Sequence, residues 1–285
     1  MIAVRLEGRL GNQMFQYAFI YATARRLNTS FYLDKSIENF LLPQYFEIKN
    51  DFIQPLDNRI FSIKGYKNLF QFYLKKAFYA MLRMILFGNN KIIIDNDTSV
   101  NAALTRIKNN CLYEGYFHSE SYFAAYKKEI KKLYTVRETY KAAFEQLKKQ
   151  FNPAKKKAVI HVRRKDYIDI AAALPLSYYK KAIDIINSDD MQFIFISDDP
   201  AFIEDEFGYV NNKYISTHNE IIDLQFMMNA DVCILSCSSF SWWGAWLNTQ
   251  ENKHVFAPQY WLGFKQQVEF PVGIADNLNF NWINV

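Results

Sequence analysis

The sequence predicts an α/β protein built on parallel sheets. Its 285 residues suffice for one large or two ordinary domains, and its 50% hydrophobic and 22% charged content is typical of a folded globular protein. From residue 155 onward, strand-like apolar segments alternate with helix-like ones. Because parallel strands need crossover helices, this alternation predicts a doubly wound parallel sheet in the second half of the chain.

The first half is expected to be mixed α/β. Residues 2–6 alternate as a strand does, Gly8-Arg9-Leu10-Gly11 forms a turn, and Asn12 is expected to cap a helix that ends near Leu27. Further short strands are expected at 31–34, 92–94 and 112–117.

The second half contains the clearer elements. Strands are expected at 158–162, 192–197, 232–236 and 254–257, with helices at 178–186, 219–228 and 240–249. The stretch 148–157 is strongly basic and contains a proline, as a connection between domains would. We therefore expect two domains, 1–152 and 153–285.

Charge and cysteine content restrict the class of protein. The 34 basic and 29 acidic residues give a net charge of +5, which suits an anionic ligand or a membrane surface, and we expect no nucleic-acid partner. The three cysteines lack paired metal spacing, which predicts a reducing cytoplasm and no zinc site. Arg5 precedes any apolar stretch of signal-peptide length, so neither secretion nor a membrane span is expected.

The segment Tyr66–Phe87 is apolar and aromatic but is interrupted by Lys67, Lys75, Lys76 and Arg83. It could form a basic amphipathic helix that makes peripheral contact with anionic lipid. The more ordinary interpretation, which we favour, is a helix packed on the core with its lysines reaching water.

The densest chemical motif is His161-Val162-Arg163-Arg164-Lys165-Asp166-Tyr167, at the carboxyl end of an expected strand. Ligands of open α/β sheets bind at that edge. Two guanidinium groups can grip phosphate oxygens, and His161 and Asp166 can exchange protons. The alternative is a solvated basic loop in which Asp166 balances the arginines.

Two more polar motifs follow expected strands. Ser197-Asp198-Asp199-Pro200 offers carboxylates to a base or ribose, although Asp is equally an ordinary helix cap. Residues 237–246 place hydroxyl groups at a helix start, which is a binding site for anions. The plain alternative there is a capped core helix.

Two patterns in the first half are weaker. Residues 8–13 lack a full dinucleotide fingerprint, so NAD binding has little support. Asp95-Asn96-Asp97 follows an apolar strand, as in the Asp-x-Asp motif of metal-dependent glycosyltransferases. A turn explains this pattern as well, and we favour the turn.

Taken together, five motifs resemble the α-1,2-fucosyltransferase family and occur in that family's order. They are residues 8–18, 115–120, 161–167, 197–199 and 238–246, within a stretch from residue 2 to about 247. The resemblance implies a GT-B fold of two facing Rossmann-like domains, GDP-fucose as donor, inversion at the sugar carbon and no obligatory metal.

The resemblance also implies roles for particular residues. Arg163 should grip the β-phosphate with Arg164 supporting the loop, and His161 and Asp199, helped by Asp198, should face the guanosine. Ser238, Ser239 and Phe240 should lie at the diphosphate, Gly11, Asn12 and Gln13 should close over the donor, and Tyr116, His118 and Glu120 should contact the acceptor. Lys165 and His118 depart from the family pattern, where glycine and glutamine are frequent.

Transfer to a hydroxyl group also needs a base that takes its proton. The candidates are carboxylates near these motifs: Asp166 first, Asp169 second, and Glu114 or Glu120 as outsiders.

These observations predict an inverting transferase that moves fucose from GDP-fucose to the 2-hydroxyl of a terminal galactoside. The setting expected is bacterial surface-polysaccharide (O-antigen) assembly in the cytoplasm, with an acceptor that could be lipid-linked. Two alternatives stay open: a metal-dependent glycosyltransferase that uses Asp95 and Asp97, and a glycan or sugar-nucleotide binding module without turnover.

Overall fold

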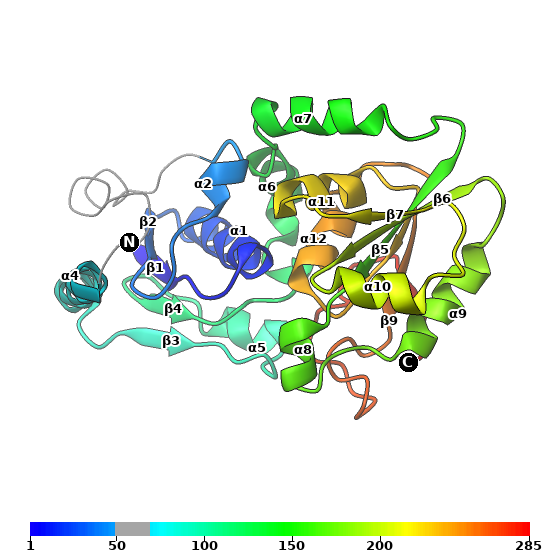
Figure 1. The fold of residues 1–285 in the computed structure, drawn as a ribbon. Helices are drawn as coiled ribbons and strands as arrows, with labels where there is room; N and C mark the ends of the chain where they lie inside the picture. The colour runs from blue at the N-terminus through cyan, green and yellow to red at the C-terminus, as the bar shows by residue number, and fades with distance from the viewer. Residues whose placement is uncertain (49–68) are drawn as a thin grey trace. The chain divides into compact units, whose positions relative to one another are not determined.

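The computed structural model describes residues 1–48 and 69–285 and divides into two compact units (Figure 1). The first unit comprises Met1–Val136 and Val272–Asn277, and the second comprises Arg137–Pro271 and Leu278–Val285.

The division differs from the expected boundary after residue 152. Helix α7 (Glu138–Lys148) belongs to the second unit because it packs on α11 (Glu220–Met228), where the rings of Phe144 and Phe226 lie 5.1 Å apart. Val272–Asn277 returns to the first unit because the Val272 amide donates to the Asn96 carbonyl at 2.8 Å. These contacts join residues far apart in sequence, so local composition did not reveal them.

The first unit contains a four-stranded parallel sheet in the order β2-β1-β4-β3. The strands are β1 (Ile2–Arg5), β2 (Phe31–Asp34), β3 (Lys91–Ile93) and β4 (Leu112–Glu114). The α-helices that the structure describes in this unit are α1 (Leu10–Arg26), α2 (Leu42–Tyr45), α4 (Leu69–Phe87), α5 (Val100–Thr105) and α6 (Lys127–Leu133).

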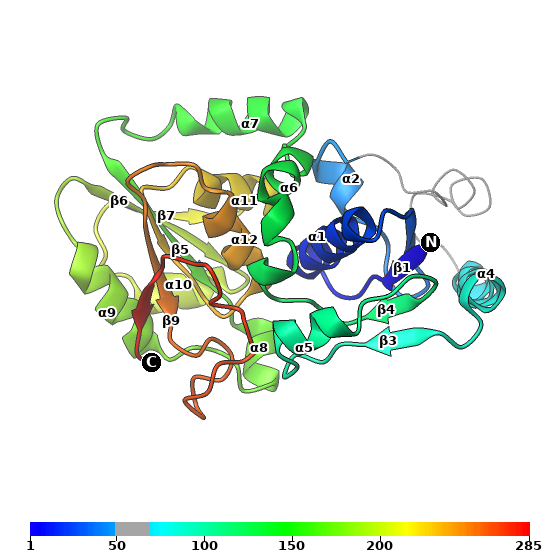
Figure 2. The same cartoon turned by 180° about the vertical axis from the view of Figure 1, so that it is seen from behind.

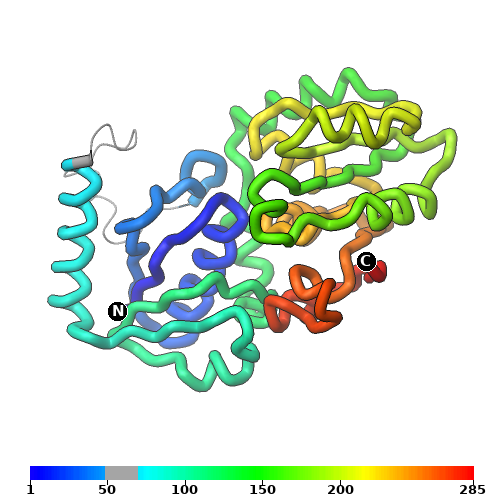
Figure 3. The backbone as a smooth tube through the Cα atoms, turned by 60° about the horizontal axis from the view of Figure 1, so that its bottom comes forward, coloured from blue at the N-terminus to red at the C-terminus, as the bar shows by residue number. Residues whose placement is uncertain are grey.

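Helices α1 and α4 pack on opposite faces of this sheet. Ala3 pairs in register with Tyr32 and Leu112, and these side chains form a buried cluster with Tyr79 and Phe87 of α4. Tyr113 follows Leu112, so it points to the other face, where its ring lies 5.3 Å from that of Phe19 of α1. Helix α4, cyan in Figure 3, runs along the side of the unit.

Helix α1 begins three residues earlier than expected, and Asn12 is not its cap. The N-cap is Arg9, which makes no side-chain capping bond. Gly8 has φ of +76°, so the chain turns into the helix directly after β1, and an added Cβ there would lie 2.5 Å from the Asn12 side-chain nitrogen. Glycine at this position therefore leaves Asn12 room in the first turn of α1.

The second unit contains a six-stranded parallel sheet in the order β10-β9-β8-β5-β6-β7. The strands are β5 (Lys156–Val162), β6 (Met191–Ser197), β7 (Lys213–Ser216), β8 (Val232–Ile234), β9 (His254–Pro258) and β10 (Asn281–Ile283). The remaining helices are α8 (Lys165–Asp169), α9 (Leu176–Ile186), α10 (Pro200–Glu206) and α12 (Ser239–Leu247). The expected doubly wound sheet is confirmed, and β7, β10, α8 and α10 are added to it.

Both faces of this sheet are covered (Figures 1 and 2). The Phe195 ring lies 5.0 Å from that of Phe207 at the end of α10, whereas the preceding Ile194 lines a cavity together with Phe226 of α11. Helices α11 and α12 approach closely at Gly244, where an added Cβ would lie 2.6 Å from the Cβ of Met227.

The expected segment Tyr66–Phe87, in which cations interrupt the apolar residues, forms α4 from Leu69 onward. Residues 66–68 lie outside the described residues. The interpretation that the lysines of α4 reach water is wrong for Lys75, which is only 4% exposed. Apolar side chains of α4 face outward instead. Among the helices described, none is long and apolar enough to cross a bilayer.

Candidate functional site

Three of the predicted motifs meet at one edge of the second sheet. From β5 the chain proceeds to β6 and β7 on one side, and from β8 it proceeds to β9 and β10 on the other. The strand order thus reverses between β5 and β8, and ligands of open α/β sheets bind beyond the carboxyl ends of the strands at such a switch point. Residues 161–163 complete and follow β5, 236–238 follow β8, and 197–199 follow the neighbouring β6.

His161 is buried at this point, with 5% of its surface exposed. Its Nδ1 lies 2.7 Å from Ser236 Oγ, and its ring lies 5.4 Å from that of Phe240. Burial, with a smaller effect of Arg163, lowers the pKa of His161 to about 3. His161 is therefore a neutral hydrogen-bonding group near pH 7 and not a proton shuttle.

Arg163 is held between two carboxylates. Its Nη2 donates to Asp166 Oδ2 at 2.7 Å, and its Nε lies 3.3 Å from Asp198 Oδ2. These contacts fix the plane of the guanidinium, whose remaining N–H groups can still donate to an oxyanion. Burial alone would lower the pKa of Arg163, but the two carboxylates raise it, so the group stays charged.

Arg164 is anchored by protein groups. Its backbone N–H donates to Asp198 Oδ1 at 2.9 Å, and its Nε donates to Asp199 Oδ2 at 3.4 Å. The guanidinium carbon lies 3.5 Å from the centre of the Phe202 ring, an arrangement that favours a cation on an aromatic face. Arg164 thus fixes the loop that carries Arg163. We call Arg163, Arg164, Asp166, Asp198 and Asp199 the arginine cluster.

Asp199 also caps α10, because its Oδ1 accepts from the Phe202 N–H at 3.3 Å. The ordinary interpretation of this residue as a helix cap is confirmed. Both of its carboxylate oxygens have protein partners.

The start of α12 lies in the same loop region. Ser238 is its N-cap, with Oγ accepting from the Phe240 N–H at 3.3 Å. Ser241 Oγ donates to the carbonyls of Ser236 and Ser238, and Tyr167 OH donates to that of Cys237 at 3.1 Å. These hydrogen bonds hold the loop that leads to the amino-terminal, positive end of α12, a helix of nine residues.

The candidate bases differ in their surroundings. Asp166 and Asp169 are both exposed on α8, and Asp166 is paired with Arg163. Glu114 is paired with Arg5 at 2.6 Å and with Lys91 at 3.3 Å.

Glu120 is 2% exposed and is paired with Lys127 at 2.8 Å. Glu114 and Glu120, the two less favoured candidates for the base, are therefore both engaged in ion pairs within the first unit. The structure also leaves Glu120 little surface for contact with an acceptor.

The first unit has its own switch point, between β1 and β4. Asn12 Oδ1 lies 3.1 Å from His118 Nε2, and the His118 ring stacks on Tyr116 with 5.3 Å between centroids. Burial lowers the pKa of His118 to about 3, so it too is neutral near pH 7. We call Asn12, Tyr116 and His118 the Asn12 cluster; the structure brings these three predicted residues together.

Gln16 joins the two loops at this switch point, a role that the sequence analysis missed. Its Nε2 donates to the Gly115 carbonyl at 3.1 Å, and its Oε1 accepts from the Glu7 N–H at 3.0 Å. Gly115 has φ of +148°, and an added Cβ would lie 2.4 Å from the Ile94 carbonyl oxygen, so glycine is required there. In the sequence, the signal for this role of Gln16 is a polar residue among the apolar positions of the expected helix.

Gln13 is placed differently from the expectation that it closes over the donor. It is fully buried; its Nε2 donates to the carbonyls of Gly8 and Asn39, and its Oε1 accepts from the Leu41 N–H at 2.9 Å. These bonds use its amide to brace the loop after β2. Gly11 is likewise buried, in the first turn of α1.

Asp95 and Asp97 are exposed, and the Thr98 N–H donates to the Asp95 carbonyl at 3.0 Å. The turn that we favoured for this segment is confirmed. Within residues 1–48 and 69–285, no group of three or more His, Cys, Asp or Glu side chains is arranged to hold a metal ion.

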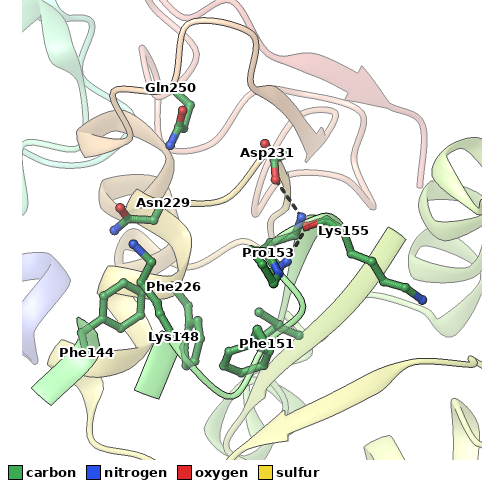
Figure 4. Close-up of a pocket in the computed structure, with 11 residues that line it drawn as sticks. Phe144, Lys148, Phe151, Pro153, Lys155, Phe226, Asn229, Asp231 and Gln250 are labelled. Carbon is green, nitrogen blue, oxygen red and sulfur yellow. Dashed lines mark hydrogen bonds between the residues drawn. The ribbon is translucent and has the colours of Figure 1, made fainter. Parts of the chain in front are cut away.

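A separate cavity of about 300 Å³ lies at the opposite edge of the second sheet (Figure 4). Lys157 at the start of β5 and Asp231 just before β8 line it, together with the rings of Phe144, Phe151 and Phe226. It is therefore remote from the arginine cluster and does not belong to the candidate site.

Comparison with known proteins relates this arrangement to glycosyltransferases. WbnK, an O-antigen biosynthesis glycosyltransferase from Escherichia coli, is 28% identical over 311 aligned residues, covering 98% of this chain and 99% of WbnK. An alpha-1,2-colitosyltransferase from the same species is 26% identical over 276 residues, covering 92% of each chain.

Solved structures show the same fold. The fucosyltransferase NodZ from Bradyrhizobium matches with a TM-score of 0.55 and 12% identity, over 86% of this chain and 91% of NodZ. A mutant of Arabidopsis thaliana FUT1 in complex with GDP matches with a TM-score of 0.51 and 10% identity, over 90% of this chain and 69% of that one. The expected GT-B fold class is confirmed.

The family assignment agrees with the order of the motifs. The model of glycosyl transferase family 11 matches residues 1–283, and all five motifs lie within that range. The chain is therefore a glycosyltransferase that belongs to glycosyl transferase family 11.

Proposed function

We propose that this chain transfers L-fucose from GDP-fucose to the 2-hydroxyl of a terminal galactoside, with inversion at the sugar carbon, in bacterial O-antigen assembly. The observation that carries the proposal is the arginine cluster, which lies at the β5–β8 switch point beside the start of α12.

The proposed reaction moves negative charge toward this site. The acceptor oxygen bonds to the fucose C1, the C1–O bond to the β-phosphate breaks, and GDP leaves with the electron pair. The Arg163 guanidinium and the N–H groups at the start of α12 would stabilise the departing diphosphate. Fixed cationic and dipolar groups can do this without a divalent ion, so we propose no obligatory metal or other cofactor.

The same edge would hold the nucleoside. Neutral His161, oriented by Ser236, can hydrogen-bond without adding charge, and its neighbour Phe240 offers an aromatic surface. Asp198 and Asp199 would act through the arginine loop that they hold, and Asp199 would in addition face the guanosine.

We assign the acceptor proton to a carboxylate, because burial lowers the pKa of both His161 and His118 to about 3 and makes both imidazoles weak proton acceptors. We propose Asp166 as the base. When the β-phosphate takes over the Arg163 guanidinium, Asp166 would lose its ion-pair partner and gain affinity for a proton. Asp169, on the same short helix, is the second choice.

The Asn12 cluster would contact the acceptor, which moves Asn12 from the donor role implied by the family resemblance, because its Oδ1 lies 3.1 Å from His118 Nε2. Its Tyr116 and His118 rings are stacked, and the amide of Asn12 can hydrogen-bond a sugar hydroxyl. The names of the relatives, one for O-antigen synthesis and one for an alpha-1,2 transfer of colitose, support the proposed process and linkage.

The test is to incubate the purified protein with GDP-fucose and a panel of galactosides, and to assign the product linkage by NMR. An α-1,2-linked fucoside is expected, and Arg163→Lys serves as the inactive control. Preference for a colitose donor would show that the proposed donor sugar is wrong, and a different linkage would show that the proposed acceptor hydroxyl is wrong. Donor binding without product would favour a binding module.

A further inference from the structure

The outward face of α4 carries a continuous apolar stripe. Positions 70, 73, 74, 77, 81, 84 and 85 repeat at the three- and four-residue spacing of one helix face. The large side chains on it are between 46% and 71% exposed: Phe70, Tyr73, Leu74, Met81, Met84 and Ile85. We call these six residues the outer face of α4. Single exposed apolar residues are ordinary, but a continuous stripe of them indicates an interaction surface.

Contacts on the opposite side fix this orientation. The Asp34 side chain is fully buried, and its Oδ2 accepts from Arg83 Nη1 at 2.8 Å. Lys75 Nζ donates to Asn39 Oδ1 at 3.2 Å. Tyr79 and Phe87 pack into the core on the same side. Rotating the helix to hide its apolar stripe would leave Asp34 buried without its cation, which is strongly unfavourable.

We propose that the outer face of α4 docks on an anionic lipid bilayer. Residues 69–91 contain no acidic residue. Of their four cations, Arg83 and Lys91 are paired with Asp34 and Glu114 and Lys75 is buried, whereas Lys76 lies exposed on α4. Apolar side chains would enter the boundary between headgroups and acyl chains, while Lys76 would remain among anionic headgroups. The stripe from Phe70 to Ile85 extends about 22 Å, so the helix can lie along the surface over most of its length.

The position of α4 favours lipid over a second copy of the chain. Lys75 bonds to Asn39, and Asn39 in turn accepts from Gln13, the neighbour of Asn12. The amino-terminal half of α4 therefore lies at the sheet edge that carries the Asn12 cluster, where a lipid-linked acceptor would enter. A stripe one helix wide is also smaller than the roughly 800 Å² per partner that a stable protein interface buries.

The test is co-sedimentation of the full chain with vesicles of phosphatidylcholine alone or mixed with phosphatidylglycerol. Binding to the mixed vesicles is expected, with a decrease at high salt and in Lys76→Gln. The triple variant Tyr73→Ser, Met84→Gln, Ile85→Gln should lower vesicle partitioning at least tenfold. Ile185→Gln is the matched control, because Ile185 is similarly exposed but lies on α9 of the second unit.

Two further measurements separate this proposal from the proposed function. The triple variant should keep the wild-type melting temperature, GDP affinity and turnover of a soluble galactoside. Failure of wild-type protein to bind mixed vesicles, or equal binding by the triple variant, would overturn the proposal whatever the activity. A dimer that dissociates in the triple variant, with no vesicle binding, would assign the face to a second copy instead.

Discussion

At the scale of single residues, the donor site depends on carboxylates that hold arginines. Arg163 contacts Asp166 and Asp198, and Arg164 contacts Asp198 and Asp199. All five residues could be identified from the sequence, because each follows an apolar strand. It could not pair them, since Asp198 and Arg164 are 34 positions apart and only the adjacency of β5 and β6 brings them together.

The first prediction concerns Arg163. Arg163→Lys should lower kcat/KM for the donor by at least about 10²-fold, because a point ammonium cannot reproduce the two-pronged contact of a guanidinium with phosphate. Steady-state kinetics below donor saturation measure this. Arg164→Lys is the control and should lose less, since Arg164 supports the loop. Unchanged kcat/KM in Arg163→Lys would remove the phosphate role.

The second prediction separates catalysis from binding at Asp166. If Asp166 is the base, Asp166→Asn should lower kcat by about 10²–10⁴ while GDP affinity changes little. The 2.7 Å ion pair with Arg163 supplies the rival expectation, in which the variant loses GDP affinity along with rate. Calorimetric titration of GDP beside kcat decides between them. Parallel losses would move the base assignment to Asp169, for which Asp169→Asn is the matched variant.

At the scale of elements, periodicity predicted the described strands apart from β7 and β10, and it predicted helices α1, α4, α9, α11 and α12. It did not predict which way α4 faces. Its cations and apolar residues are spaced so that either side could point inward. Asp34, which is buried at the end of β2, fixes the orientation of α4 because it accepts a hydrogen bond from Arg83, forty-nine positions later. A contact of that range leaves no trace in the helix sequence itself.

The contact between α11 and α12 gives the third prediction. Gly244→Ala should lower the free energy of unfolding by about 1–3 kcal/mol, because the new Cβ would lie 2.6 Å from the Met227 Cβ in a close-packed core. Urea denaturation measures the change. Met227→Gly, which removes that Cβ, should relieve the clash, so the double variant should be more stable than the two single changes added together predict. Simple additivity would contradict the proposed contact.

The fourth prediction concerns Asp223 on α11. Burial raises its pKa to about 7, although Ser216 donates a hydrogen bond to its carboxylate and opposes the shift. The folded state therefore holds a proton that the unfolded chain releases near pH 4. It follows that stability from this group is greatest below pH 4 and falls as pH rises to about 7.

Asp223→Asn should remove this dependence. Urea titrations at pH 5 and pH 8 measure the free energy of unfolding of both proteins. The stability of the variant relative to wild type should be about 1–2 kcal/mol higher at pH 8 than at pH 5. Asp184→Asn, an exposed acid on α9, is the control. An equal difference between variant and wild type at both pH values would show that Asp223 is ionised throughout.

At the scale of the whole molecule, the family and the fold class could be predicted because five short motifs occur in a fixed order. The division into units could not be predicted, because α7 is held by Phe226 and Val272–Asn277 returns to the first unit. Both are long-range contacts, whereas the basic stretch at 148–157 is only a local change in composition.

The fifth prediction is that turnover persists in saturating EDTA. Arginines and a helix start supply the positive charge for the departing diphosphate in this account, so removing divalent ions should lower kcat less than about twofold. Asp95→Ala should likewise retain activity. Strict dependence on Mg²⁺ or Mn²⁺, with loss of activity in Asp95→Ala, would favour the metal-dependent alternative.

The most direct test of the account is a crystal structure of the chain with GDP bound. We expect the β-phosphate within hydrogen-bond distance of the Arg163 guanidinium and of the N–H groups that begin α12, with His161 at the nucleoside. GDP bound elsewhere, for example in the cavity beside Phe144 and Lys157, with the arginine cluster unchanged, would contradict the account.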